Sequence, residues 1–353
     1  MSEGAAPPPR ALTDRRWYRR SVAVARVALT VAITIFGLLA LTFFIGRLLP
    51  LDPVLAVLGD DASQAAYDRM YRQLGLDRPL YEQFFNYVRD ALQFDFGRSL
   101  TSGRPVMTDI ARVFPATVEL ATLSMFFGTL IGVPLGVIAA ARQDSWVDQV
   151  IRVVALIGYS APNFWLGLVG LSVFFAGLGW VGGPGRIGTV YQFDIEIRTG
   201  LLLIDSARMG RWDIFQDVVS RLILPVSILA YGAMAYIARM TRSFMLEQLR
   251  QEYIIAARAK GVSRTAVIWV HAFPNIAVQL ATVIALSFAF LLEGAVLTET
   301  VFAWPGLGRY LTTALLRGDM NAVLGCVMVI GLIFITLNLL ADLFYRSFDP
   351  RTR

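Results

Sequence analysis

The sequence has very few of the residues that build disulfides, metal sites and nucleotide-binding loops. Its 353 residues include one cysteine (Cys326), one histidine (His271) and one lysine (Lys260). A single cysteine excludes an intrachain disulfide and a cysteine-based metal cluster, and a single histidine excludes an HExxH-like zinc site. Lys260 precedes Gly261 but lacks the upstream glycine of a phosphate-binding loop. We therefore expect no metal and no nucleotide on this chain.

Charged residues are also scarce, at 16%, against 56% hydrophobic residues. One soluble core does not account for such a composition. Six uncharged runs come near the roughly 20 residues that a bilayer-spanning helix needs, and the third, which is overlong, contains glycines that predict its helical end near Leu178. The runs are Val27–Gly46, Leu120–Ala141, Val153–Gly185, Leu222–Ala238, Ala272–Leu292 and Met320–Ala341. The sequence predicts an all-α polytopic membrane protein with six transmembrane helices.

Basic residues predict the orientation of these spans, because cytoplasmic segments collect Lys and Arg. Residues 1–26 hold six arginines against two acids, and residues 239–275 hold five arginines and Lys260 against two acids. Residues 50–115 and 180–217 carry slightly more acid than base. Both termini and the 239–275 loop are therefore expected in the cytoplasm. The net charge of +6 reflects this topology, and no nucleic-acid partner is expected, since the arginines lie beside spans.

Two segments are expected outside the membrane, and a third at the start of the chain is expected to be disordered. Residues 50–117 show helical spacing, as at Tyr67, Met70, Tyr71 and Leu74, which predicts a helical extracytoplasmic cap. The later segment 182–217 contains the alternation Tyr191–Ile197, which favours a short strand or extended piece. Residues 1–16 are rich in Pro, Ala and Arg, a composition typical of disorder.

The loop from Arg239 to Asn275 is the most informative stretch of the chain. Two short helix-forming runs meet there at Gly261, where a residue without a Cβ makes a sharp turn easy to form. Small residues at Ala256, Ala257 and Ala259 leave room for another backbone to approach. This pattern predicts a helix-turn-helix that docks onto a partner, since a mere connector is usually polar and featureless.

The second span carries small residues at intervals of four, Gly128, Gly132 and Gly136. Such a face lets another transmembrane helix approach closely. We predict that it lies at a helix–helix interface and does not face lipid.

Five residues near the ends of spans or at membrane depth are candidates for a transport path or gate: Asn163, Trp165, Glu293, Glu299 and Trp304. Asn163 follows a proline inside the third span, where polar groups face protein or a water-filled cavity. It equally fits a packing kink with an interhelical hydrogen bond. Glu293 is an acid near hydrocarbon, or an interfacial carboxylate. Trp304 suits a membrane interface, or an outer gate.

Several phrases of the sequence resemble those of ABC-importer permeases. Ala256, Ala257, Gly261 and Pro274 keep the spacing of their cytoplasmic coupling loop, although Ile255, His271 and Phe273 stand where the general pattern has Glu, Ile and Leu. The phrase from Ala257 to Gly261, which includes Arg258, Ala259 and Lys260, is similar to that of the dipeptide and oligopeptide branch. So are Leu74–Pro79 and Thr298–Tyr310.

The resemblance implies a type I ABC-importer permease in a bacterial inner membrane. The expected parts are a cytoplasmic tail (1–26), a first transmembrane helix (27–49), the extracytoplasmic segment (50–117), a permease core with five spans (118–345) and a second tail (346–353). Expected partners are a second homologous permease, two ATPase subunits that hold ATP and Mg, and an extracytoplasmic binding protein. The implied cargo is a dipeptide or oligopeptide; similar permeases carry nickel complexes, glutathione or oligosaccharides.

Two rivals belong to different classes. An ion-coupled secondary transporter is expected to show inverted repeats and charges inside several spans, and the spans here are nearly free of charge. A membrane enzyme needs a paired catalytic constellation, and none stands out in this sequence. The residues of the coupling loop favour the importer over both.

Overall fold

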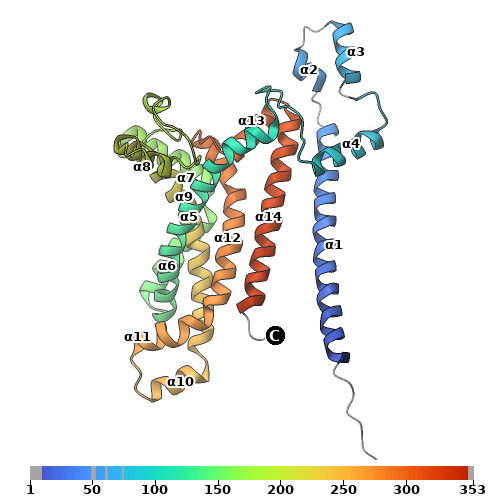
Figure 1. Cartoon of the computed structure of the whole chain (residues 1–353). Coiled ribbons are helices and arrows are strands. Elements are labelled where there is room, and N and C mark those ends of the chain that lie inside the picture. The colour runs from blue at the N-terminus through green and yellow to red at the C-terminus, as the bar shows by residue number, and fades with distance from the viewer. Residues whose placement is uncertain (1–9, 49–52, 60–62, 74, 349–353) are drawn as a thin grey trace, which may run out of the picture.

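The computed structural model describes residues 10–48, 53–59, 63–73 and 75–348, and its regular structure is helical (Figure 1). Among these residues the sole β-pairing is an isolated bridge between Arg98 and Pro105. The strand or extended piece expected at Tyr191–Ile197 is wrong as a strand. A 3₁₀ turn, Thr189–Tyr191, leads there into irregular backbone, because no neighbouring strand is present to complete a ladder.

Five helices are long and apolar enough to cross a membrane within the described part of the chain. They are α1 (Arg10–Leu48), α5 (Val106–Ala141), α9 (Trp212–Leu249), α12 (Phe273–Val301) and α14 (Met320–Phe348). The first helix begins well before the expected 27–49, so the expectation of disorder through residue 16 is wrong from Arg10 onward. Residues 1–9 and 349–353 of the two tails lie outside the described residues.

The third expected span, a helix from Val153 to about Leu178, is instead a pair of bent helices that form a broken span or a re-entrant loop. The helices α6 (Trp146–Ser160) and α7 (Asn163–Gly170), the latter continued by a π-helical segment to Gly177, meet at a 97° bend. Pro162 explains the break, because proline has no N–H and disfavours helical geometry in the preceding residue. Ala161 accordingly has an extended ψ of 128°.

The short helices separate the molecule into two ends (Figure 1). One end carries α2 (Pro53–Leu58), α3 (Gln64–Gln73), α4 (Leu80–Leu92), α8 (Leu202–Arg208) and α13 (Leu307–Leu316), and the opposite end carries α10 (Glu252–Ala259) and α11 (Arg264–Ala266). The start of α1 and the end of α14 lie on the α10 side. This arrangement agrees with the topology predicted from the basic residues, so we call the α10 end cytoplasmic and the other end outer.

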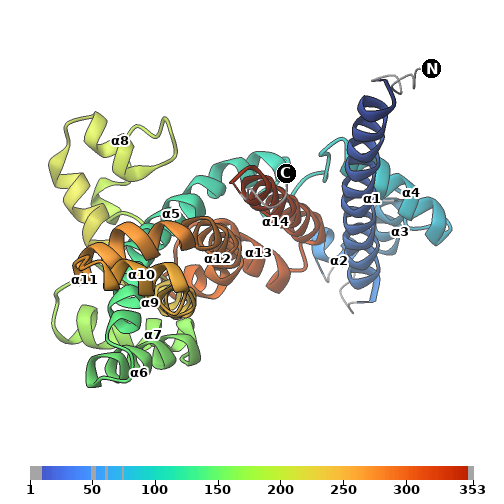
Figure 2. The same ribbon diagram turned by 90° about the horizontal axis from the view of Figure 1, so that it is seen from below.

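Two groups of apolar side chains hold the helices together. The larger joins α5, α9 and α12 through fully buried residues such as Leu120, Ile237 and Ile276. The smaller joins α1, α4 and α14 through Leu39, Ala91 and Cys326. Figure 2 shows the result from below: α1 and the outer helices α2–α4 lie on one side of α14, and α6, α7 and α8 lie on the other.

The contact between α5 and α9 is the most extensive between two helices, and α5 presents its three glycines to α9 there. A Cβ on Gly128 would lie 2.9 Å from that of Ala233, and one on Gly136 would lie 2.6 Å from the carbonyl oxygen of Ala238. Gly132 is equally tight, with Met234 O at 2.9 Å from such an atom. All three glycines are buried. They bring the two backbones together as small-residue faces do in membranes.

The variant Gly136→Ala is expected to destabilise the protein by about 1–3 kcal/mol, the usual cost of overpacking, because its methyl group would collide with the α9 backbone. The matched control is Gly37→Ala, since a Cβ on Gly37 meets nothing within 4 Å. Thermal unfolding of the purified proteins in one detergent measures both. Equal midpoints for the two variants would contradict the close α5–α9 packing.

Candidate functional site

The coupling loop, residues 239–275, forms a projecting helical hairpin at the cytoplasmic end (Figures 1 and 2). The chain leaves α9 at Leu249, forms α10, turns over Lys260–Ser263 and re-enters the membrane core through α11 and α12. Gly261 sits in the turn with φ +77°, a left-handed conformation that costs other residues energy. Two short helical runs therefore meet at this glycine.

One face of α10 is fixed to the rest of the chain. Ile254 is fully buried and Ala257 packs beside it against the main core. The Tyr253 hydroxyl donates to Gln248 Oε1 at 2.9 Å and accepts from Asn275 Nδ2, also at 2.9 Å. These bonds join α10 to the end of α9 and the start of α12, so a displacement of α10 pulls on both membrane helices.

The other face of α10 is open. Ile255, Ala256, Ala259 and Lys260 are exposed, and Ile255 keeps 59% of its surface accessible. Arg258 is exposed as well. An exposed isoleucine beside two exposed alanines forms a small, flat apolar surface with basic residues at its edge. This combination is suited to contact with another protein, and its small side chains allow a close approach.

Pro274 explains the unusual start of α12. It lies in an otherwise continuous helical run, where its ring clashes with the carbonyl four residues earlier and its missing N–H leaves a bond unmade. The helix widens to a π-helical segment, Val267–Ala272, immediately before it, as such segments commonly do at functional places. Asn275 Nδ2 donates to His271 O at 2.8 Å. His271 itself is half-buried and lies at the boundary between loop and span.

The path and gate candidates separate into exposed, buried and undescribed residues. Asn163 opens α7, half-buried, with its side-chain oxygen beside Gly232 of α9, and Trp165 is 53% exposed. Both remain predictions as path residues. Glu293 falls within α12, but its side chain lies outside the described residues. Glu299 and Trp304 are fully buried, so neither lines an open path in this structure, and their assignment to a gate remains a prediction.

Glu299 instead holds together the turn between α12 and α13, residues 299–309, which we call the outer turn. Its carboxylate accepts from Thr117 Oγ1 of α5 at 2.6 Å and from the backbone N–H groups of Gly308 and Arg309 at 2.7 and 3.1 Å. The last two belong to the first turn of α13, where a negative charge is favourable. Glu299 therefore closes the turn and fixes it to α5.

Trp304 anchors the same turn. Its indole Nε1 donates to Ala116 O of α5 at 3.0 Å, and its backbone N–H donates to Glu299 O at 2.8 Å. A tryptophan at a membrane interface would keep its ring partly accessible, so the expectation of an interfacial Trp304 is wrong. The ring is buried because the turn folds back onto α5.

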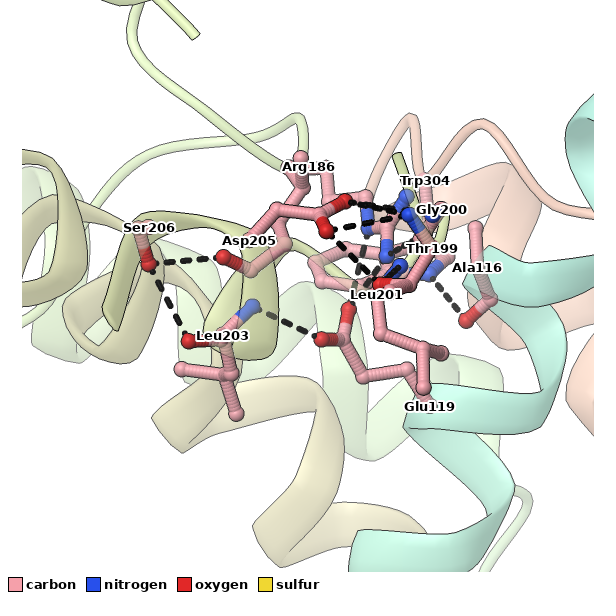
Figure 3. Close-up of polar contacts among 11 residues, drawn as sticks. Ala116, Glu119, Arg186, Thr199, Gly200, Leu201, Leu203, Asp205, Ser206 and Trp304 are labelled. Carbon is pink, nitrogen blue, oxygen red and sulfur yellow. Dashed lines mark hydrogen bonds and ion pairs between the residues drawn. The ribbon is translucent and has the colours of Figure 1, made fainter. Parts of the chain in front are cut away.

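A second polar cluster, missed by the sequence reasoning, lies beside the outer turn (Figure 3). Arg186 donates to Glu119 Oε2 of α5 from Nε at 3.1 Å and from Nη2 at 2.5 Å, and Nη2 also reaches Gly200 O at 2.6 Å. Both charged side chains are over 90% buried. The guanidinium carbon lies 5.9 Å from the ring centre of Trp304. This ion pair attaches the loop after α7 to the outer end of α5.

The same loop is closed on itself by Asp205 of α8 (Figure 3). Its carboxylate accepts from Thr199 N at 3.0 Å, from Thr199 Oγ1 at 2.8 Å and from Gly200 N at 3.1 Å. Leu203 N donates to Glu119 at 3.0 Å. The one sequence feature that could have indicated this cluster is the charge of Glu119, which lies just before an uncharged run. Its partner is 67 positions away and could not be identified from spacing.

None of these clusters has the composition of a metal centre. Within the described residues no three His, Cys, Asp or Glu side chains gather closely enough to bind an ion. The carboxylates of Glu119, Asp205 and Glu299 each have protein donors. These carboxylates hold loops in place by accepting hydrogen bonds, whereas the exposed face of α10 is available for contact with another protein.

Comparison with known proteins shows extensive similarity to transport permeases. Residues 132–353 match the family model described as binding-protein-dependent transport system inner membrane component, and residues 22–121 match the model of its N-terminal part. The chain is 40% identical over 319 residues to a probable D,D-dipeptide transport system permease protein of Escherichia coli (strain K12), covering 90% of this chain and 94% of that protein.

Two further relatives extend this similarity. A di/tripeptide transport system permease protein of Pseudomonas aeruginosa (strain UCBPP-PA14) is 41% identical, with 91% of this chain and 95% of that protein covered. Among solved structures, an inward-facing conformation of the MetNI methionine ABC transporter matches with a TM-score of 0.52 at 19% identity. The match covers 68% of this chain and 96% of that one. The fold is therefore that of a type I ABC-importer permease.

Removal of the Glu299 carboxylate should destabilise the outer turn. Glu299→Ala should unfold at a lower temperature than the wild-type protein, because the N–H groups of Gly308 and Arg309 lose their acceptor. Glu299→Gln keeps a side-chain oxygen and should lose less. Thermal unfolding of the purified proteins measures both, and equal midpoints for the two variants would contradict this role of Glu299.

Removal of Arg186 should be costly, because it leaves the Glu119 carboxylate buried without its counter-charge. We expect Arg186→Met to lower the free energy of unfolding by about 3–5 kcal/mol, the usual effect of breaking a buried pair. The double variant Glu119→Gln/Arg186→Met should recover much of this loss. A double variant no more stable than the single one would show that the ion pair is not the source of the effect.

Proposed function

Because the chain belongs to the family of binding-protein-dependent transport system inner membrane components, we propose that it forms half of the membrane channel of a peptide importer. Two peptide transport permeases, from Escherichia coli and Pseudomonas aeruginosa, are about 40% identical over nearly the whole chain. Their cargo supports dipeptides or short peptides as the substrate class here. The protein is located in the bacterial inner membrane.

The proposed complex contains a second, homologous permease, two ATPase subunits and an extracytoplasmic binding protein. ATP and Mg are held by the ATPases. We assign ATP hydrolysis to these subunits, since the sequence of this chain lacks a Walker A loop. The binding protein delivers the peptide to the outer end of the molecule, where α8, α13 and α2–α4 lie (Figure 1).

The single observation that carries this proposal is the geometry of α10. Its open face bears Ile255, Ala256 and Ala259, whereas its inner face is joined to α9 and α12 through Tyr253. A helix built in this way receives a push from a partner on one side and passes it to two membrane helices on the other. We call α10, which transmits motion in this way, the lever of the coupling loop.

Such a lever operates only when its contacts with the ATPases differ between nucleotide states, because a partner that binds both conformations equally shifts no equilibrium. When the ATPases close, α10 moves with them and carries the inner ends of α9 and α12. Their tight packing on α5 passes the motion to the outer turn. Access to the path then alternates between the two ends of the molecule.

The experiment that tests this function is peptide uptake by proteoliposomes that contain the complete complex. Ala256→Arg places a long charge on the open face and should abolish uptake and peptide-stimulated ATP hydrolysis. Ala256 is the better position for this test than Ala257, whose side chain packs on the core of its own chain. The protein should still be present in the membrane at the wild-type level.

The matched control is Ala25→Arg, an exposed alanine at the cytoplasmic edge of the apolar span of α1. It introduces the same residue into a helix far from α10 and should leave coupling intact. Normal uptake by Ala256→Arg would contradict the lever. Equal loss in both variants would point to a general effect of the added charge.

A further inference from the structure

Beside α10 lies a hollow with a strongly basic lining, which we call the arginine notch. It lies between the inner ends of α5 and α9 and the turn from α10 to α11, with a volume of about 830 Å³. Its lining includes apolar residues such as Leu249, Val262 and Ile268. Four arginines border it: Arg142, Arg250, Arg258 and Arg264.

No carboxylate lines this notch. Within the described part of the chain none of its four arginines forms an ion pair with an acid. Arg264 donates to Ala141 O at the end of α5, which places its charge at the negative end of a helix dipole. All four side chains are exposed. The notch is therefore a concentration of uncompensated positive charge.

None of the described acids at this end of the molecule forms an ion pair with these arginines. Asp148 is occupied by Arg242, which donates to it at 2.6 and 2.7 Å. Asp144 lies in the turn after Arg142 and does not line the notch. Glu247 lines the adjoining hollow between α6 and α9, which shares Arg250 with the notch, and Glu252 lies in the first turn of α10. The topology rule accounts for arginines beside spans, but it does not require four of them, from four different segments, to border one hollow.

We propose that the arginine notch binds a carboxylate-bearing segment of the ATPase subunit while the open face of α10 docks on that subunit. This inference rests on the proposed function and specifies the chemistry of the partner: Asp or Glu side chains, held by guanidinium groups. Guanidinium forks bind carboxylates in bidentate geometry.

Continuity with α10 supports this assignment. Arg258 belongs to α10 itself, and Val262 and Arg264 lie in and just after its turn. A partner on the open face of α10 is thus adjacent to the notch. Arg142 and Arg250 close α5 and α9, so a carboxylate bound there contacts the ends of both helices. The bond would link the ATPase to the α5–α9 pair directly, in parallel with the lever of α10.

The test is the affinity of purified ATPase subunits for the permease pair in nanodiscs of zwitterionic lipid, measured at several salt concentrations. For Arg142→Gln/Arg258→Gln we expect about tenfold weaker binding and a shallower salt dependence, as for the loss of complementary interface charges. The matched control is Arg26→Gln/Arg152→Gln. It removes two exposed arginines from the same end of the molecule outside the notch and should bind like the wild-type protein.

A second measurement identifies the acid. Arg142→Glu/Arg258→Glu should bind still more weakly, and an Asp→Lys or Glu→Lys change on the ATPase should restore binding to this variant but not to the wild-type permease. Equal affinity and salt dependence in wild type and Arg142→Gln/Arg258→Gln would overturn the inference and leave the proposed function intact. A salt-dependent difference seen only in nanodiscs with anionic lipid would overturn it in favour of a lipid phosphate. Absence of ATPase binding by the wild-type pair would overturn both.

Discussion

The close approach of α5 and α9 is the contact on which the rest of this structure depends. Three glycines of α5 face the α9 backbone, and atoms only 2.6–2.9 Å from where a Cβ would stand occupy the space of any side chain. Lipid tails are as apolar as the helices, so packing of this kind, and not hydrophobicity, brings transmembrane helices together. The helices α5 and α9 therefore behave as one unit, with one end in the cytoplasm and the other end outside.

Each end of the α5–α9 pair contacts a different functional segment of the molecule. At the outer end, a short stretch of α5 supplies Ala116 O to Trp304, Thr117 Oγ1 to Glu299 and the Glu119 carboxylate to Arg186. One turn of helix thus fixes both the outer turn and the loop after α7. At the cytoplasmic end, α9 leads into α10, and α5 ends beside the arginine notch. Motion received at one end has a rigid route to the other.

Sequence reasoning predicted the parts that depend on local pattern. Uncharged runs indicated the membrane helices, and Gly261 indicated the turn after α10, because its backbone conformation is a property of one residue. It failed where distant residues decide. Glu299 and Trp304 were candidates for a path or gate, but their burial against α5, which lies more than 180 positions earlier, was not predicted. The alternation at Tyr191–Ile197 favoured a strand, but no partner strand exists among the described residues.

The third span shows a mixed result. Its proline and Asn163 were visible in the sequence as a possible kink, but the sequence did not predict that α6 and α7 would meet there at a 97° bend. The arginine notch could not be anticipated either. Its four arginines are distributed between positions 142 and 264, and only the fold shows that they border one hollow.

The central claim is that the open face of α10 touches an ATPase subunit. Site-specific crosslinking tests it most directly, because the one native cysteine, Cys326, is fully buried. In membranes that contain the whole complex, the account predicts that a thiol-reactive crosslinker joins the Ala256→Cys variant to the ATPase. It predicts no crosslink between the Ala65→Cys variant and the ATPase. A crosslinked product of equal yield from both, or from neither, would contradict the claim.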